Sequence, residues 1–236
     1  MNQILTKLER KYSRFAIPNL MTILVFGMAL VFLLDTFTSA NPDYEYTLSS
    51  LLYFDWELIK KGQIWRIITF LFMPEGESPL FIIFELYFYW LIGKSLETHW
   101  GSFRFNVFYF IGAIGSAISG IFTGYATNEY LNLSMFLAFA TLFPNFEVLL
   151  FFFIPVKMKF LGWLSGAGLI LMLIFYPWIY KIAILVSMLN FILFFGKDFY
   201  QRIRLFFRRL KFRKQNKSGW KNNHWWEDDN NNPWKK

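Results

Sequence analysis

The chain contains no cysteine, and only two of its 236 residues are histidine. The absence of cysteine excludes a disulfide scaffold, a thiol nucleophile, and zinc or iron–sulfur sites with cysteine ligands. The two histidines, His99 and His224, lie in a turn and in the C-terminal tail. We therefore predict no metal and no cofactor.

Charged residues are also scarce, at 17%, whereas hydrophobic residues make up 56% of the chain and aromatic residues 22%. A soluble domain of this size could not cover so much apolar surface with polar groups. The composition therefore indicates an integral membrane protein. The abundance of Phe, Trp and Tyr suits a lipid-facing surface with aromatic belts at both interfaces.

Apolar stretches predict six membrane spans. No charge occurs from Phe15 to Leu34, and we interpret this run as a retained first helix, not as a cleaved signal peptide. The predicted spans are about 15–35, 80–96, 103–124, 131–154, 159–176 and 178–196. Pro144-Asn145 interrupts the fourth, so we expect a shorter helix there that leads into an extended segment ending at Pro155. The expected fold is an all-α polytopic membrane protein, a six-helix bundle.

The charges between the spans predict the orientation, because Lys and Arg concentrate on the cytoplasmic side. With the N-terminus inside, the inside segments include Lys94 with Arg104 and Lys157 with Lys159, whereas the outside loop 125–130 has no Lys or Arg. We therefore expect both termini to be cytoplasmic. Frequent Phe, Ile, Asn and Lys are typical of proteins encoded by AT-rich genomes, which favours a bacterial source. We therefore expect the protein in a bacterial plasma membrane.

The first loop, residues 36–79, carries a helical pattern of its own. Apolar residues recur there at helical spacing, at Leu48, Leu51, Leu52, Trp56 and Ile59. Because charged residues lie beside them, the pattern predicts a helix in the membrane interface.

The net charge of +8 belongs to the tail. Residues 197–236 hold 12 lysines and arginines against 4 acidic residues, whereas the first 196 residues hold 12 of each sign. The pattern of residues 197–213 predicts a basic amphipathic helix that binds the bilayer and its anionic headgroups. The polar composition of residues 214–236 predicts a disordered segment. The headgroup-binding residues are Arg202, Arg204, Arg208 and Arg209. Nucleic-acid binding is the rejected alternative, because the adjacent span holds this segment against lipid.

Small residues recur every four positions in the third span, at Gly112, Ser116, Gly120 and Gly124. Such a stripe lets membrane helices approach closely. We therefore expect the third span to lie in the centre of the bundle. Gly162 repeats the pattern with Gly166 in the fifth span.

Three stretches share their residues and their order with one known family. Residues 62–72 read Gly-Gln-Ile-Trp-Arg-Ile-Ile-Thr-Phe-Leu-Phe, and residues 96–105 read Leu-Glu-Thr-His-Trp-Gly-Ser-Phe-Arg-Phe. Residues 143–157 read Phe-Pro-Asn-Phe-Glu-Val-Leu-Leu-Phe-Phe-Phe-Ile-Pro-Val-Lys. Over about residues 60–196 the chain resembles the rhomboid superfamily, including its Derlin-like members. The resemblance implies a rhomboid-like bundle with structural motif residues Trp65, Arg66, Glu97, Gly101 and Arg104.

The chain lacks the residues that the family's proteases use. Those enzymes place a Ser within Gly-x-Ser-Gly early in the fourth helix and a His in the sixth, because a serine hydroxyl needs a base to become a nucleophile. Ser134 stands in Asn-Leu-Ser-Met, without those glycines, and the segment from Ser187 to Asn190 stands where the His is expected.

The oxyanion-stabilising positions are altered as well. The family spacing places the helix-two His and Asn at Phe81 and Glu85 of this chain. A carboxylate at Glu85 would repel a developing oxyanion. Nucleophile motif, base and oxyanion donors therefore fail together, and the chain resembles a non-proteolytic rhomboid relative.

Several polar side chains remain as candidates. Charge is costly within the membrane and often functional there. The candidate intramembrane polar site comprises Glu85, Ser134, Ser187 and Asn190. We expect Trp65 and Arg66 to anchor the first loop at the headgroups, and Glu97 to pair with Arg104 in the turn. Near the inner interface, Glu147 is expected to pair with Lys157 or Lys159.

Three functions are consistent with these observations. The preferred hypothesis is a proteolytically inactive pseudoprotease that binds transmembrane segments of client proteins or thins the bilayer, as the resemblance implies. The first alternative is an intramembrane serine protease with a non-standard site. The second is a small transporter or lipid-handling protein that uses Glu85.

Overall fold

The computed structural model describes residues 2–40, 47–76, 78–150, 154–196, 204 and 208, and the chain forms two units, 1–194 and 195–236. In the second unit, Arg204 and Arg208 are helical and exposed. The rest of the predicted basic helix, with Arg202 and Arg209, lies outside the described residues, as does the tail 214–236.

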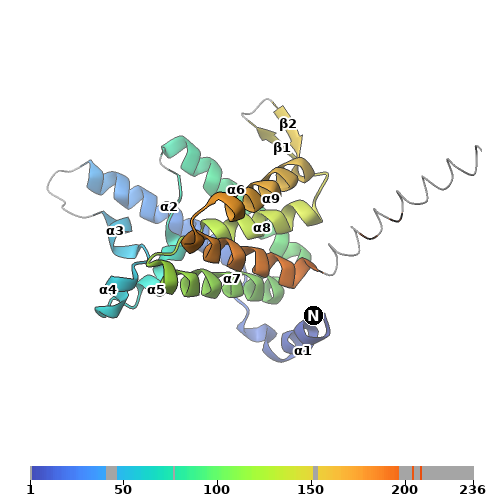
Figure 1. Ribbon diagram of the computed structural model, residues 1–236, viewed down its shortest axis with the longest axis horizontal. Coiled ribbons are helices and arrows are strands. Elements are labelled where there is room, and N and C mark those ends of the chain that lie inside the picture. Colours follow the sequence, from blue (N-terminus) through green and yellow to red (C-terminus); the bar gives the residue numbers. More distant parts are fainter. Residues whose placement is uncertain are drawn as a thin grey trace, which may run out of the picture. The chain divides into compact units, whose positions relative to one another are not determined.

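Long apolar helices dominate the first unit (Figure 1). Among the described residues, five helices are long and apolar enough to cross a membrane: α2 (Leu20–Ser39), α6 (Pro79–Trp100), α7 (Ser102–Thr123), α9 (Met158–Phe175) and the helix Trp178–Gly196. A sixth and shorter helix, α8 (Glu129–Leu142), lies between α7 and α9 in the sequence. The predicted all-α polytopic membrane fold is confirmed.

The region predicted as the fourth span, 131–154, divides into a helix and a hairpin. Helix α8 ends at Leu142, and β1 (Glu147–Leu150) pairs antiparallel with β2 (Ile154–Lys157). The register places Glu147 opposite Lys157, and their side chains form the predicted ion pair at 3.7 Å. Pro144 follows the helix directly, which explains why the helix does not continue through the apolar residues beyond it.

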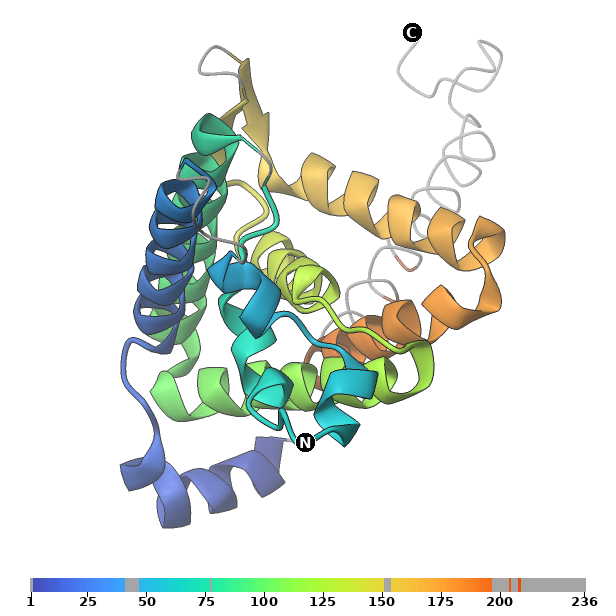
Figure 2. The same ribbon diagram turned by 90° about the vertical axis from the view of Figure 1, so that its left-hand side faces the viewer.

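The N-terminal segment adds a helix that the sequence pattern did not predict. Helix α1 (Asn2–Tyr12) and the short turn η1 (Ser13–Phe15) precede α2. Helix α2 begins at Leu20, five residues later than predicted, because Pro18 and a left-handed Asn19 (φ 56°) interrupt the chain. Helices α2 and α6 lie side by side (Figure 2), and Met21 packs against Gly93.

Helix α7 is the most buried of the five long helices, as expected for the centre of the bundle. Its fully buried aromatic residues, Phe105, Phe108 and Tyr109, lie near its start. Helix α7 therefore supplies much of the core against which the polar residues described below are arranged.

The first loop forms several short helices in place of the single interfacial helix that the pattern predicted. These are α3 (Leu48–Leu52), α4 (Trp56–Lys60), α5 (Arg66–Thr69) and η2 (Phe70–Phe72). The break between α3 and α4 has a local cause. The Asp55 carboxylate accepts the backbone N–H groups of Glu57 and Leu58, so a new helix starts there.

Candidate functional site

A serine and an asparagine meet in the interior of the bundle. Ser134 of α8 and Asn190 of the last helix are both almost fully buried. The Asn190 side-chain Nδ2 donates a hydrogen bond to Ser134 Oγ at 3.3 Å. Ser134 Oγ in turn donates to the backbone oxygen of Leu131 at 2.8 Å. The structure thus brings together two of the four residues proposed from the sequence as an intramembrane polar site.

The close contact depends on Gly112 of α7. A Cβ atom at this position would lie 2.7 Å from Asn190 Nδ2 and 2.3 Å from Leu131 Cδ1. The glycine therefore provides the space in which three helices converge. Ser187, one turn before Asn190, donates its hydroxyl to the backbone oxygen of Tyr130 and fixes the last helix against α8.

The chemistry of this pair differs from that of a nucleophile and its base. An asparagine amide donates through nitrogen and accepts through oxygen, but it does not take up a proton at neutral pH. The Ser134 hydroxyl is already engaged with its own helix. Within the described residues the one histidine, His99, is exposed and packs edge-on against Phe143. Ser134 consequently lacks a proton acceptor in the described part of the chain.

Two unpaired acceptors lie in the same interior. Asn190 Oδ1 is buried without a hydrogen-bond partner, and so is Asn132 Oδ1, half a turn from Ser134 on α8. An unpaired polar atom is expensive in a low-dielectric interior. Both atoms are enclosed, so a polar group of another segment could reach them only if the neighbouring side chains moved.

A carboxyl pair lies where the first loop enters α6, and Glu85 belongs to it. Glu85 is half-buried and accepts the backbone N–H of Glu75 at 3.0 Å. The Glu75 carboxylate accepts hydrogen bonds from Tyr89 Oη at 2.9 Å and from Asn132 Nδ2 at 3.1 Å. Glu85 does not contact Ser134 through any described hydrogen bond, so the predicted polar site divides into two.

Burial raises the pKa of Glu75 from 4.5 to about 7. The charges of Glu85 and Glu129 act in the same direction, whereas the hydrogen bonds from Tyr89 and Asn132 oppose them. Glu75 as a whole residue is exposed, but its carboxyl group is enclosed by these neighbours. Glu75 was not predicted, because in the sequence it is one of several acidic residues in a polar loop.

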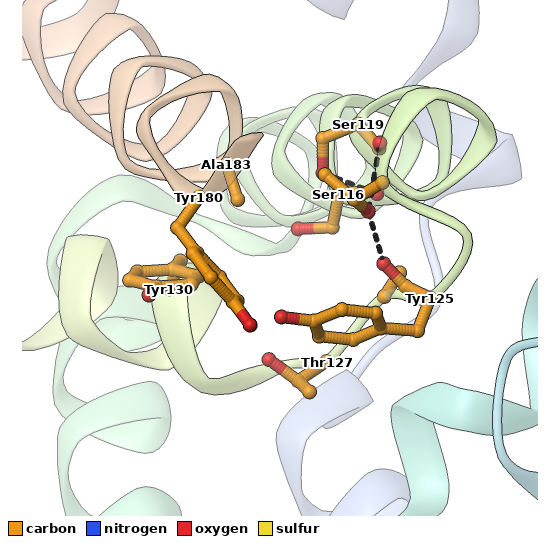
Figure 3. Close-up of a pocket in the computed structure, with 9 residues that line it drawn as sticks. Ser116, Ser119, Tyr125, Thr127, Tyr130, Tyr180 and Ala183 are labelled. Carbon is orange, nitrogen blue, oxygen red and sulfur yellow. Dashed lines mark hydrogen bonds between the residues drawn. The ribbon is translucent and has the colours of Figure 1, made fainter. Parts of the chain in front are cut away.

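A third polar group of residues lines a pocket at the C-terminal end of α7 (Figure 3). Seven hydroxyl side chains line it, those of Ser116, Ser119, Thr123, Tyr125, Thr127, Tyr130 and Tyr180. The hydroxyls of Tyr125 and Tyr180 point toward each other. A pocket of hydroxyl groups suits water or a neutral hydrogen-bonding ligand. Of the glycine stripe, only Ser116 contributes to this pocket.

The first loop is fastened by Arg66, but not to headgroups as predicted. Arg66 is 2% exposed, and its guanidinium donates to the backbone oxygens of Ser50 and Tyr53 and to Gln63 Oε1. It also lies over the Tyr53 ring at 4.7 Å. Trp65 is 49% exposed and donates through Nε1 to the backbone oxygen of Leu51. The N–H donors of Arg66 and Trp65, which we predicted to bind lipid headgroups, therefore donate to backbone oxygens of the loop and to Gln63 Oε1.

The loop also reaches the glycine stripe of α7. The buried Phe54 side chain occupies the space beside Gly120, where a Cβ atom would lie 2.5 Å from its ring. The backbone N–H of Trp56 donates to the oxygen of Gly124, which ends α7 with φ at 91°. The stripe thus serves two contacts, a helix crossing at Gly112 and the first loop at Gly120 and Gly124.

The predicted ion pair between Glu97 and Arg104 is wrong. Glu97 is buried and accepts the backbone N–H of Asn19 and the hydroxyl of Ser102, so it caps the start of α2. Arg104 donates to Glu9 of α1, with Nη2 to Oε2 at 2.8 Å. Glu9 lies 95 positions away in the sequence, so the local turn motif gave no sign of it. Between them, Gly101 adopts φ of 85° and joins α6 to α7.

Comparison with protein-family models matches residues 61–198 to the model described as Rhomboid domain. The match covers more than half of the chain and includes α5 to α9 and the last helix. It also includes both Ser134 and Asn190. No curated protein and no solved structure matches the chain.

Proposed function

Since the chain belongs to the rhomboid family, we propose that it is a proteolytically inactive rhomboid-domain protein that binds transmembrane segments of other membrane proteins. The observation that carries this proposal is the hydrogen bond between Ser134 and Asn190. An amide stands where the resemblance to rhomboid proteases leads us to expect an imidazole.

The geometry of the pair supports inactivity independently of the motif. A serine hydroxyl becomes a nucleophile when an adjacent base removes its proton. Asn190 donates to the serine oxygen and therefore stabilises a lone pair that attack would require. In addition, Glu85 stands at the position where the resemblance to the family's proteases leads us to expect an oxyanion-stabilising asparagine, and a carboxyl group is a poor replacement for that donor.

The binding half of the proposal draws on the polar interior and on α8. The buried Oδ1 atoms of Asn132 and Asn190 lack a hydrogen-bond partner, and they would favour a hydrogen bond to another helix if the side chains around them moved, since lipid offers none. Helix α8, with 14 residues, is about 21 Å long, against about 30 Å for a bilayer core. A helix this short favours local thinning of the bilayer, which would lower the cost of bringing a client segment to the polar residues.

Reconstitution with a transmembrane reporter tests both halves. The purified protein is expected to co-purify with the intact reporter, to release no fragment, and to remain unlabelled by a fluorophosphonate probe. Ser134→Ala is the matched control and should behave as the wild type in cleavage and labelling. Fragments or labelling that disappear in Ser134→Ala would establish a protease and overturn the proposal.

The carboxyl pair favours a second candidate, a proton-coupled transporter or lipid-handling protein. The Glu85 carboxylate accepts the backbone N–H of Glu75, and the charges of Glu85 and Glu129, both negative, act on the Glu75 carboxyl. Intramembrane acidic residues often carry protons in transporters. Under this candidate, Glu85→Gln abolishes proton uptake into proteoliposomes. Uptake that is unchanged by the substitution would remove it.

A further inference from the structure

Helix α1 has three faces with different chemistry. At 100° per residue, Thr6 and Glu9 share one face, Lys7, Arg10 and Lys11 share a second, and Leu5, Leu8 and Tyr12 share a third. A helix of 11 residues that is divided in this way is typical of interfacial helices.

The first face is fastened to the bundle. Arg104, in the first turn of α7, donates through Nε and Nη2 to Glu9 Oε2 at 3.0 and 2.8 Å. Arg104 Nη2 also lies 3.4 Å from Thr6 Oγ1. Glu9 is the only acidic residue before Asp35, and it is paired with Arg104. The N-terminal segment therefore has no other acidic side chain to pair with its own cations.

The second face is cationic and uncompensated. Lys7, Arg10 and Lys11 are exposed, and Arg14 follows them in η1. None of the four forms an ion pair with another described residue. Four cations within eight residues attract anionic headgroups, each contributing about 1 kcal/mol near a charged bilayer.

The third face exposes large apolar side chains beside these cations. Leu8 is 40% exposed, Tyr12 39%, and Phe15, in the adjoining turn, 65%. Lys11 Nζ lies 5.2 Å from the centroid of the Tyr12 ring, and the Arg14 guanidinium lies 4.8 Å from that of Phe15. Rings and aliphatic stems in lipid, with cationic ends at the headgroups, are the usual arrangement at an interface.

The position of α1 fits a bilayer surface. The turn at η1 and Pro18 redirects the chain, so α1 runs across the axis of α2 in Figure 2. Its contact with Arg104 places it at the end of the bundle where both α2 and α7 begin. Because these are spanning helices, this end lies at one membrane surface.

We propose that α1 binds the anionic lipid headgroups of this membrane surface, with Leu8, Tyr12 and Phe15 inserted at the headgroup–acyl boundary and the cations of its second face paired with phosphates. The proposal does not depend on client binding or on proteolytic inactivity. It adds a lipid site in the N-terminal segment, apart from the one predicted in the C-terminal tail.

A single introduced cysteine tests the proposal, because the chain has no native one. Leu8→Cys, labelled with an environment-sensitive fluorophore, is reconstituted into vesicles of phosphatidylcholine alone and of phosphatidylcholine with phosphatidylglycerol. We expect a blue-shifted emission and quenching by brominated lipid in the anionic vesicles, both reduced by high salt. Adding Lys7→Glu and Lys11→Glu should lower the ratio of inserted to free α1 by at least about fivefold per cation.

The matched control replaces Lys60 and Lys61, two exposed lysines of the first loop, by Glu. It changes the net charge equally and should leave the signal at position 8 unchanged. The proposal is overturned if the fluorophore stays in water in both vesicle types. It is also overturned if insertion is the same with and without phosphatidylglycerol, or if the two charge-reversed proteins behave alike.

Discussion

Asn190 is the side chain that contacts the Ser134 hydroxyl, and an amide cannot remove a proton from it. The two side chains are in hydrogen-bond contact, and Gly112 holds the space open for them. At the same scale, Arg66 shows how a cation can be buried in a membrane protein, because its donors meet backbone oxygens and an aromatic ring. Glu75 shows the opposite case, because burial raises the pKa of its carboxyl group and so favours the protonated form.

Replacing Asn190 by His tests whether the absence of a base beside Ser134 would alone account for the proposed inactivity. We expect Asn190→His to remain inactive on a transmembrane reporter and unlabelled by fluorophosphonate. The reason is that Ser134 still lacks the neighbouring glycines, and Glu85 still stands where the resemblance leads us to expect an oxyanion donor. Cleavage by Asn190→His that is abolished by adding Ser134→Ala would contradict this account.

Replacing Arg66 by alanine should lower the free energy of unfolding by more than most single substitutions do. Arg66→Ala leaves the loop carbonyls of Ser50 and Tyr53 unpaired, at a cost of about 2–4 kcal/mol. Unfolding in detergent, followed by circular dichroism, measures the change. The exposed Lys61 provides the control, and Lys61→Ala should alter stability by less than about 0.5 kcal/mol. Equal effects of the two substitutions would show that Arg66 does not brace the loop.

Glu75 predicts a pH dependence with a definite sign. Its folded pKa, about 7, lies above the ordinary 4.5, so between these values the folded protein holds a proton that the unfolded chain has lost. Stability should therefore fall as pH rises from about 4.5 to about 7 and should not change further above that range. Glu75→Gln is expected to reduce this slope in thermal unfolding, whereas the exposed Glu57→Gln should not. An unchanged slope in Glu75→Gln would refute the assignment.

At the scale of elements, the spans were predictable and their contacts were not. Uninterrupted apolar runs fix α6, α7, α9 and the last helix to within a few residues, because the bilayer sets the length of such runs. Pro144 and Asn145 predicted that the fourth span would change to an extended segment, but the pairing of that segment as an antiparallel hairpin was not predicted. Contacts between distant residues, such as Arg104 with Glu9 or Asn190 with Ser134, have no local signature in one sequence.

Two glycines in different helices differ in how closely other side chains pack against them, so their substitution by alanine should have different effects on stability. A Cβ at Gly112 would lie 2.3 Å from Leu131, whereas nothing lies within 4 Å of one at Gly166. Gly112→Ala should therefore cost about 1–3 kcal/mol through overpacking. Gly166→Ala should be neutral or stabilising by up to about 1 kcal/mol, because alanine favours a helix. Detergent unfolding of both variants checks this, and an equal loss in both would contradict the packing described.

The ion pair between Glu9 of α1 and Arg104 of α7 should contribute modestly to the free energy of unfolding. Its side chains are 35% and 30% exposed, so a double-mutant cycle of Glu9→Gln and Arg104→Gln is expected to give a coupling of about 0.2–1 kcal/mol. The cycle is measured by unfolding in detergent at low and high salt. A coupling of zero at both salt concentrations would mean that α1 is held at the bundle by other contacts.

At the scale of the whole molecule, the chain has a rhomboid domain, and we propose that the catalytic chemistry of the family's proteases is absent from it. The spans, the first loop and the stripe of small residues preserve a bundle in which α8 and the last helix still meet. What lies between them is an amide–hydroxyl contact with unpaired acceptors nearby. This interior supports our proposal that the protein binds the helix of another membrane protein and does not cleave it.

Site-specific photo-crosslinking in native membranes tests this central claim most directly. A photoreactive residue replaces Leu189, beside Asn190 and 55% exposed, and a control replaces Leu30 of α2, 49% exposed. Mass spectrometry then identifies the captured peptides. The account predicts intact transmembrane segments captured from position 189 in excess over position 30. It is contradicted by equal capture at both positions, or by captured segments that are cut in the wild type and intact in Ser134→Ala.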